Sequence, residues 1–545
     1  MAGSSQIRNA SFASQRGWSL ILLAVLFTLA RAPLLGLLPA SGDEAYYWQC
    51  ARHPDWSYYD QPPLMIALIG LSTHLFGINV TAVRLPALLL GLLMPLALLW
   101  IGRRLFQDHR APLWAVLGLM ATPLFTLGTL YASTDVLLCL FVPIVPALAA
   151  VAIVEDDPRL WLVVGLLTGL AGLAKFSAVL MVPAILALAL LSPVGRRHLR
   201  RSEPYVGALL ALTAVSPALI WAGLHHGDNI LFQLVTRHAG HSFSFRWLGE
   251  YLAPQLLLDS PLLFPLLCAG LIVETRRAWR ERDLPTLALA LPADIFLGFF
   301  ALVALRTESA PHWAAPAAIG GSLVTARWIA RRWGDWGGKQ RSFVFVSLAL
   351  GWALTAAAHL LLLGVDRVPP GIDYNGRVGT DALRNVRGWP DLVAHLQSLE
   401  GADFDAQTDP IITDSYTTAS LIAFYSKGRY DPLLLATTGG KHGLSYLYWQ
   451  DATLYVGRPG LFVGGRRKNR TLSALRTAFG TLDPLVPFHV DEGAESASRP
   501  SQTWQIVRGE ALSSSADALL PFTPEGAKIR AAQSALRVSE NRRLR

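Results

Sequence analysis

The sequence predicts an α-helical protein that crosses a membrane many times and carries a soluble α/β domain at its C-terminal end. Of the 545 residues, 52% are hydrophobic and only 16% are charged, and long apolar segments recur up to about residue 364. The mean hydropathy is +0.38, which excludes an ordinary soluble enzyme. We therefore expect a membrane domain over residues 1–365 and a soluble domain over residues 366–545.

The net charge of +9 could indicate a nucleic-acid partner. The basic residues, however, fall mostly in short loops between apolar segments, where they set the orientation of a membrane protein instead. We therefore expect no nucleic-acid partner. The three cysteines, Cys50, Cys139 and Cys268, form no CxxC motif and have no histidine spacing typical of a metal site, so we interpret them as inert.

Apolar windows predict eleven membrane spans. The first span follows a polar segment with Arg8 and Arg16 and is longer than a signal-peptide core, which predicts an uncleaved signal anchor. The run from Pro62 to Gly77 is too short for a span and begins with two prolines, so we expect it to lie along the outer interface. The spans are expected at about residues 18–39, 82–102, 111–130, 134–154, 160–174, 176–193, 205–224, 250–273, 285–305, 313–329 and 342–364.

The arginine and lysine residues indicate which side each loop faces. If the N-terminus is cytoplasmic, the long inner loops contain fifteen of them and the outer connections contain five. Cytoplasmic loops of membrane proteins carry such an excess. We therefore expect the N-terminus inside and, after an odd number of spans, the C-terminal domain outside.

Residues 366–545 differ in composition from the rest of the chain, with polar stretches punctuated by Gly and Pro. The runs 410–413, 433–435 and 452–456 are strand-like, and the spacing from Thr418 to Tyr425 is helical. About 180 residues are enough to bury a core. This segment therefore predicts a soluble α/β domain.

An acidic and aromatic stretch, residues 41–48, directly follows the first span and is continued by residues 56–64. Asp43 and Glu44 are adjacent carboxylates at the expected membrane–water boundary, where a base can reach both a lipid-borne and a water-borne substrate. The neighbouring tyrosines fit an aromatic belt, but a belt does not require the acidic pair. This location suggests chemistry on a lipid-linked molecule.

Further ionisable residues fall on the same expected side. Asp135 opens the fourth span and Lys175 lies in the turn between the fifth and sixth. Alternatively, Asp135 is a helix N-cap, and Lys175 only extends its ammonium group to the interface. Asp259 and Asp294 lie deeper in apolar spans, where ionisable residues are functional suspects, but the sequence gives them no role. The outer loops also contain Arg237, His238, His241, Arg246, Arg306, Glu308 and His312, although loop histidines are more often only solvated.

Six short motifs occur in order along the membrane domain. They are Gly42 to Tyr47, Tyr58 to Leu64, Arg84 to Pro86, Thr134-Asp135, Leu173 to Ser177 and Pro311 to Pro316. In these motifs the sequence resembles the bacterial members of glycosyltransferase family 39, which are membrane enzymes of the GT-C class, akin to protein O-mannosyltransferases and to the lipid A aminoarabinose transferase. The resemblance covers about residues 18–365 and does not extend to the C-terminal domain, except that many relatives carry an outward-facing domain.

The resemblance implies a multi-pass enzyme of the bacterial inner membrane that transfers a sugar, with inversion, from a polyprenyl-phosphate carrier to a periplasmic acceptor. The acceptor would be lipid A or lipopolysaccharide, another envelope glycan or a protein. Asp43 is then expected to be the general base, with Glu44 and Asp135 orienting the acceptor or neighbouring cations. The leaving phosphate requires cations, for which the candidates are Lys175, Arg237, His241, Arg246 and His312. Tyr46, Tyr59, Asp60 and Glu308 are candidates for acceptor contacts.

Two alternatives stay open at this point. Asp43, Glu44 and Asp135 could hold a divalent cation, although the scheme contains no sugar-nucleotide pyrophosphate that would require one. A membrane transporter or a flippase for lipid-linked sugars would also have many spans. Transporters place polar sites near the midplane, often in repeated halves, whereas here the polar residues gather at the outer rim, which favours the transferase.

Overall fold

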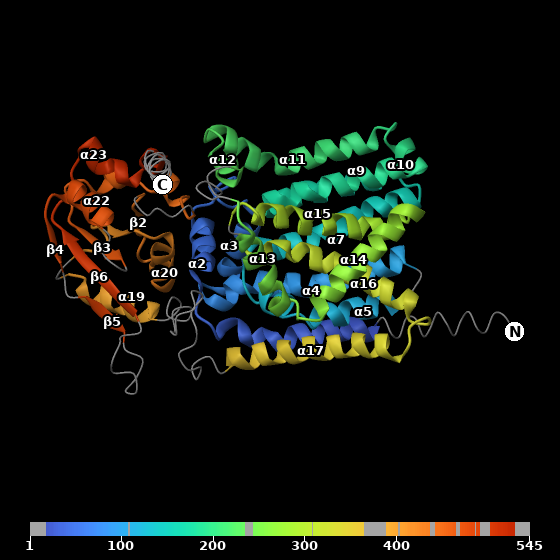
Figure 1. Cartoon of the computed structure of the whole chain (residues 1–545). Coiled ribbons are helices and arrows are strands. Elements are labelled where there is room, and N and C mark those ends of the chain that lie inside the picture. Colours follow the sequence, from blue (N-terminus) through green and yellow to red (C-terminus); the bar gives the residue numbers. More distant parts are fainter. Residues whose placement is uncertain are drawn as a thin grey trace.

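The computed structural model describes residues 18–106, 110–234, 243–307, 309–363, 388–401, 404–436, 442–464, 469–484, 487–490 and 502–528. Most of these residues form a bundle of helices that run along a common direction, and a smaller region with a β-sheet lies at one end of the bundle (Figure 1). The predicted helical membrane fold is therefore confirmed.

Within the described ranges, six helices are long and apolar enough to cross a membrane, and a bent pair is a further candidate. The bent pair consists of α13 (Phe245–Leu258) and α14 (Leu263–Glu281), which meet at 108°. Because several other bundle helices are shorter than a bilayer crossing requires, the count of eleven spans stays a prediction. The six are Trp18–Gly36, α4 (Val80–Leu105), α7 (Thr134–Val154), α11 (Glu203–Leu224), α15 (Leu284–Ala304) and α17 (Gly338–Leu363).

The shorter helices fill the bundle and form its ends. The run that was expected at the outer interface is helical, as α3, and its depth in a membrane stays a prediction. The predicted span at 111–130 is divided into α5 and α6, since Thr122 caps the start of α6 with its side chain. The shorter helices are η1 (Ala32–Gly36), α2 (Gly42–Arg52), α3 (Leu64–Phe76), α5 (Arg110–Met120), α6 (Pro123–Gly128), α8 (Leu160–Ala174), η2 (Phe176–Met181), α9 (Val182–Leu191), α10 (Pro193–His198), α12 (Asp228–Leu234), η4 (Pro311–Ala314) and α16 (Ala315–Arg332).

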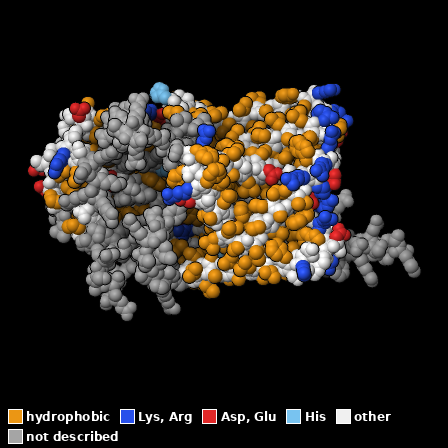
Figure 2. Space-filling model, in the orientation of Figure 1, with side chains coloured by type: hydrophobic (Ala, Val, Ile, Leu, Met, Phe, Trp, Pro, Cys, Tyr) orange, Lys and Arg blue, Asp and Glu red, His pale blue; other side chains and the backbone are white. Residues whose placement is uncertain are grey.

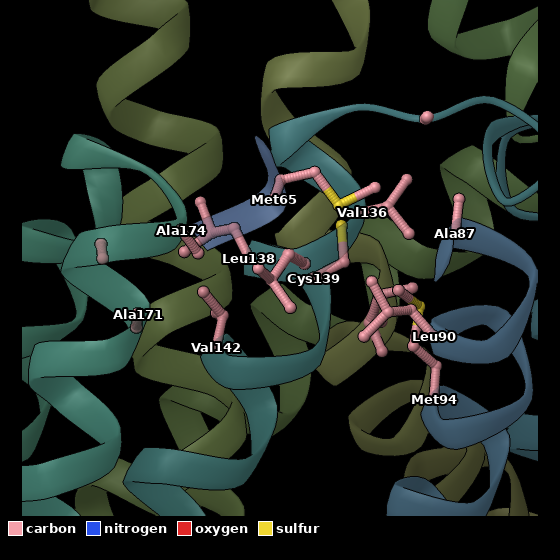
Figure 3. Close-up of a cluster of buried hydrophobic side chains, with 14 of the residues drawn as sticks. Met65, Ala87, Leu90, Met94, Val136, Leu138, Cys139, Val142, Ala171 and Ala174 are labelled. Atoms are coloured by element: carbon pink, nitrogen blue, oxygen red, sulfur yellow. The ribbon is translucent and has the colours of Figure 1, made fainter. Parts of the chain in front are cut away.

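Small residues allow the bundle helices to approach closely. A Cβ added to Gly165 on α8 would lie 1.9 Å from the carbonyl oxygen of Gly207 on α11, so these two helices pack backbone against backbone. In Figure 3, alanines from α4 and α8 lie beside larger apolar side chains from α3, α4 and α7. The first helix packs along α17, where the rings of Phe27 and Trp352 are 5.7 Å apart.

The C-terminal region contains a mixed six-stranded sheet in the order β2-β1-β3-β6-β4, with β5 also paired to β6. β1 is parallel to β2 and β3, and β6 is antiparallel to β3, β4 and β5. The strands are β1 (Ile411–Thr413), β2 (Leu433–Leu434), β3 (Gly460–Gly464), β4 (Leu482–Pro484), β5 (Phe488–Val490) and β6 (Gln502–Gly509). The helices are α19 (Trp389–Leu399), α20 (Tyr416–Tyr425), α21 (Tyr446–Trp449), η6 (Ala452–Tyr455), α22 (Asn469–Phe479), α23 (Ala516–Leu519) and η7 (Leu520–Phe522).

The local predictions for this region are mostly confirmed. The strand-like runs at 410–413 and 433–435 form β1 and β2, and the helical spacing from Thr418 to Tyr425 belongs to α20. The strand expected at 452–456 is wrong, because residues 452–455 form η6. Asp451 caps this turn by accepting a hydrogen bond from the Thr453 N–H at 2.9 Å. The boundary between the two predicted domains stays a prediction.

The charge distribution of the bundle is asymmetric along its length. Hydrophobic side chains cover its flank, and Lys and Arg side chains gather at the end that lies away from the sheet region (Figure 2). α10, which contains Arg196 and Arg197, lies at that end (Figure 1). The sheet region and α2 lie together at the opposite end.

Candidate active site

The acidic and aromatic stretch at residues 41–48 forms the N-terminal part of α2, and Asp43 lies in the first turn of this helix. Ser41 is the N-cap: its hydroxyl accepts a hydrogen bond from the Glu44 N–H at 3.2 Å, and its N–H donates to Glu44 Oε2 at 3.0 Å. This reciprocal capping box satisfies two backbone donors that would otherwise lack partners. Asp43 lies on the exposed side of this turn, where the helix dipole favours a carboxylate.

Glu44 is completely buried and forms an ion pair with Arg84 of α4. Its Oε1 accepts from Arg84 Nε and its Oε2 from Arg84 Nη2, both at 2.7 Å. Oε1 also accepts from the Ala132 N–H at 3.2 Å. Arg84 donates in addition to the carbonyl oxygens of Leu35, Leu38 and Pro39. Both oxygens of Glu44 are therefore occupied, and we infer that Glu44 positions α2 instead of orienting an acceptor.

Asp135, Lys175 and His312 come together from three separate segments. Asp135 lies in the first turn of α7 and accepts a hydrogen bond from the Lys175 ammonium group, which follows the C-terminus of α8. His312 of η4 places its Nε2 3.8 Å from the other Asp135 oxygen. Asp135 is nearly buried, whereas the His312 side chain is half exposed. The ion pair between Asp135 and Lys175 therefore fixes the Lys175 ammonium group near His312.

A cavity of about 330 Å³ lies next to this group, with Asp135, His312 and Tyr131 in its lining. Most of its lining is apolar, from α4, α5, α6, α7 and α16. Tyr131 connects the cavity to Asp43, since its hydroxyl lies 3.5 Å from Asp43 Oδ2 and accepts from the Ser41 hydroxyl at 3.0 Å. An exposed carboxylate, Asp43, therefore lies beyond Tyr131, which lines an apolar cavity together with His312 and with Asp135, the hydrogen-bond partner of Lys175.

The two deeper carboxylates occupy different surroundings. Asp259 ends α13 at the bend before α14 and lines both this cavity and a smaller one of about 70 Å³. Its Oδ1 is buried and has no hydrogen-bond partner among the described residues. Asp294 of α15 accepts a hydrogen bond from the Thr275 hydroxyl at 2.7 Å.

Tyr46, Tyr59 and Asp60 contact the C-terminal region instead of the cavity. Tyr46 donates to Asp60 Oδ1 at 2.8 Å, and the Gly443 N–H donates to Asp60 Oδ2 at 2.8 Å. The Tyr59 N–H donates to the Ser445 hydroxyl at 3.1 Å. We therefore infer that these three residues dock the C-terminal region on the segment that follows the first helix.

α20 completes this docking surface. The Tyr425 hydroxyl accepts from the Ala40 N–H at 2.9 Å, and the Tyr416 hydroxyl donates to Asp43 Oδ1 at 2.8 Å. Asp43 is therefore contacted both from the helical bundle and from the sheet region.

The remaining predicted cations are not part of this cluster in the described structure. Arg246 lies at the start of α13, where its Nε donates to Glu250 at 2.7 Å, and its side chain is 76% exposed. Its described contacts do not bring it to Asp43 or Asp135. Arg237, His238, His241 and Glu308 lie outside the described residues.

The possible cation ligands do not converge. Over the described ranges, no group of three or more His, Cys, Asp or Glu side chains is arranged to hold a metal ion. Glu44 is occupied by Arg84 and Asp135 is bonded to Lys175. A cation held jointly by Asp43, Glu44 and Asp135 would require these pairs to separate.

Comparisons of sequence give a consistent result. A family model described as dolichyl-phosphate-mannose-protein mannosyltransferase matches residues 60–221. The lipid A galacturonosyltransferase RgtD of Rhizobium johnstonii is 26% identical over 57% of this chain and 66% of its own length. The undecaprenyl phosphate-alpha-4-amino-4-deoxy-L-arabinose arabinosyl transferase of Pseudomonas aeruginosa is 27% identical over 52% of this chain and 55% of its own length. The chain thus spans between half and two thirds of these relatives.

The fold is also that of solved membrane enzymes. ArnT from Cupriavidus metallidurans bound to undecaprenyl phosphate matches with a TM-score of 0.58 and 17% identity, over 90% of this chain and 98% of ArnT. The chain therefore has the fold of GT-C membrane enzymes. The oligosaccharyltransferase of Archaeoglobus fulgidus, another GT-C protein, matches with a TM-score of 0.52 and 14% identity, over 84% of this chain and 68% of its own.

Three residues of this site were missing from the candidates drawn from the sequence. Arg84 belongs to one of the six motifs, and Tyr131 lies four residues before Asp135. The local sequence of neither residue indicates which partner it has in the fold. Tyr416 is 373 residues from Asp43, and nothing in its local sequence indicates that contact.

Proposed function

We propose that this chain is an inverting glycosyltransferase that moves a sugar from a polyprenyl-phosphate carrier to an acceptor at the outer face of the bacterial plasma membrane. The observation that carries the proposal is an apolar cavity lined by Asp135 and His312, with Lys175 bonded to Asp135 and with Asp43 beyond Tyr131. The similarity to the lipid A galacturonosyltransferase RgtD supports lipid A as the first acceptor to test. Other envelope glycans and proteins are the further candidates.

In the proposed reaction, Asp43 takes the proton of the acceptor hydroxyl as its oxygen attacks the anomeric carbon of the sugar. The bond between that carbon and the phosphate oxygen breaks on the opposite face, so the configuration inverts. The leaving polyprenyl phosphate carries the resulting negative charge, which Lys175 and His312 are placed to stabilise. The apolar lining of the cavity suits the isoprenoid units next to the phosphate.

The direct test is the transfer of a labelled sugar from a synthetic polyprenyl-phosphate donor to lipid A by the purified protein in detergent. We expect sugar-modified lipid A with inverted anomeric configuration and stoichiometric release of polyprenyl phosphate. Intact-mass analysis of lipid A, core oligosaccharide and envelope proteins, from cells with and without the chain, identifies the acceptor. If no sugar moves to any of them, the proposal is wrong. Repeating the assay in EDTA tests the divalent-cation alternative.

Replacing Lys175 with Ala is expected to lower donor turnover by about tenfold to hundredfold, the effect of one charge-assisted contact of about 1.5–3 kcal/mol. The reason is that the ammonium group lies where a phosphate at headgroup depth would arrive. Donor affinity and turnover of the purified variant measure the effect. Arg246→Ala, which removes an exposed cation outside the cluster, is the matched comparison. A Lys175→Ala protein with normal donor affinity and rate would show that Lys175 serves only to pair with Asp135.

We further propose that the N-terminus is cytoplasmic and that the C-terminal region is periplasmic. The gathering of Lys and Arg at the far end of the bundle supports this orientation (Figure 2). A reporter enzyme fused after Arg545 is expected to be active when it requires the periplasm and inactive when it requires the cytoplasm. The reverse pattern would overturn the orientation and the placement of the site with it.

A further inference from the structure

The N-termini of α2 and α20, which are far apart in the sequence, meet at Asp43. Tyr416 is the first residue of α20, and its hydroxyl donates to Oδ1 of Asp43 at 2.8 Å. The close approach depends on Gly42, because a Cβ there would lie 2.5 Å from Cγ2 of Thr417. A larger residue at position 42 would push α20 away from Asp43.

The Tyr416 ring is held in a niche formed by both regions. On one side the ring of Tyr46 packs edge-on at a centroid distance of 5.2 Å. Gly443 also lies against Tyr416: a Cβ there would be only 2.0 Å from Cγ of Tyr416, and φ of Gly443 is +77°. Glycine adopts this backbone conformation without strain and leaves room for the ring.

One carboxylate connects the two walls of this niche. Asp60 is 3% exposed, and it accepts the Tyr46 hydroxyl on Oδ1 and the Gly443 N–H on Oδ2. A buried carboxylate that accepts two hydrogen bonds holds both donors in a defined position. The niche therefore has a fixed geometry when the C-terminal region is docked.

The Tyr416 hydroxyl has to be protonated to donate a hydrogen bond to Asp43. Burial, together with the Asp43 carboxylate, raises the pKa of its phenol well above the usual range. The hydroxyl therefore stays protonated at neutral pH and donates to Asp43. The second Asp43 oxygen faces Tyr131, on the side of the cavity.

From this geometry we propose that the C-terminal region supplies a positioning residue, Tyr416, whose phenol holds one oxygen of Asp43 and thereby directs the other toward the acceptor hydroxyl. The inference rests on the proposed function. Without the phenol, an exposed aspartate rotates among several rotamers, and only some of them place the base in line with the acceptor. The C-terminal region is then part of the active site, because the reaction centre is complete only when α20 is docked.

Tyr416→Phe tests this role, because it keeps the ring in its niche and removes only the hydroxyl. We expect kcat to fall by about tenfold to hundredfold, with unchanged KM for the lipid-phosphate donor and an unchanged melting temperature. Tyr425→Phe is the matched control, since it removes a phenol of the same helix that bonds the same loop at Ala40 but does not touch Asp43. We expect this control to retain wild-type kcat.

A double variant shows whether the effect passes through Asp43. When Tyr416→Phe is added to Asp43→Asn, the residual rate is expected to stay within about twofold of that of the single Asn variant, because coupled residues are not additive. Equal losses in Tyr416→Phe and Tyr425→Phe, together with lower melting temperatures, would overturn the inference and leave Tyr416 as a docking residue. Wild-type kcat in Tyr416→Phe would also overturn it and would leave the proposed function intact. A wild-type protein that transfers no sugar overturns both.

Discussion

Asp43→Asn is expected to abolish most sugar transfer while the protein still inserts, folds and binds the lipid-phosphate donor. Asparagine keeps the size of the side chain and an oxygen that accepts the Tyr416 hydroxyl, but it has no basic carboxylate to take the acceptor proton. Loss of a general base lowers rates by roughly 10²–10⁴-fold. The measurement is transfer of a labelled sugar in detergent, with folding followed by thermal unfolding.

Asp55→Asn provides the matched control for this experiment. Asp55 lies shortly after α2 and accepts a hydrogen bond from the Trp221 indole at 2.7 Å, so it is also a carboxylate with an aromatic donor. We expect it to retain near wild-type activity. If Asp43→Asn kept more than about a tenth of the wild-type rate, Asp43 would not be the essential base. That result would contradict the proposed mechanism but not the fold.

Glu44→Gln is expected to destabilise the protein strongly instead of acting on the chemical step. The change leaves the buried guanidinium of Arg84 without its counter-charge. Breaking a buried ion pair in this way costs about 3–5 kcal/mol. We expect a much lower melting temperature and a lower yield of folded protein, whereas kcat per folded molecule changes little.

An exposed pair gives the comparison for Glu44. Glu155 pairs with Arg104, and both side chains are substantially exposed, at 35% and 52%. Glu155→Gln is expected to change stability by no more than about 1 kcal/mol. The opposite result would be a Glu44→Gln protein that melts like the wild type but transfers sugar about 100-fold more slowly, as expected for loss of a general acid or base. That result would assign Glu44 a direct role in catalysis.

Much of the helical bundle could be predicted because apolar runs and chain length depend on local composition alone. The local departures from the prediction depend on single capping side chains. Asp451 caps a 3₁₀ turn where a strand was expected, and Thr122 caps a second helix within one expected span. Hydropathy windows average over such single caps and therefore do not detect them.

The acidic stretch could be found from its position after the first span. The different roles of its two carboxylates could not be predicted. Asp43 and Glu44 are neighbours in sequence, yet one is exposed and the other is fully buried. The difference arises from Arg84, which lies 40 residues away from Glu44. Asp60 was expected to contact an acceptor, and its actual partners include Gly443, 383 residues along the chain. Long-range partners of this kind are set by the tertiary fold and leave no periodic signal.

The way Asp60 joins Tyr46 to Gly443 limits how this protein can be recombined with its relatives. A chimera that receives only a foreign C-terminal region would bring a new surface to a first loop shaped for another one. Oδ2 of the buried Asp60 carboxylate would then lose the Gly443 N–H as its donor, which costs more than the hydrogen bond itself contributed. Exchange should succeed only when the segment from Ala40 to Asp60 is transplanted together with the C-terminal region. These two stretches, at opposite ends of the chain, therefore have to be inherited as a single unit.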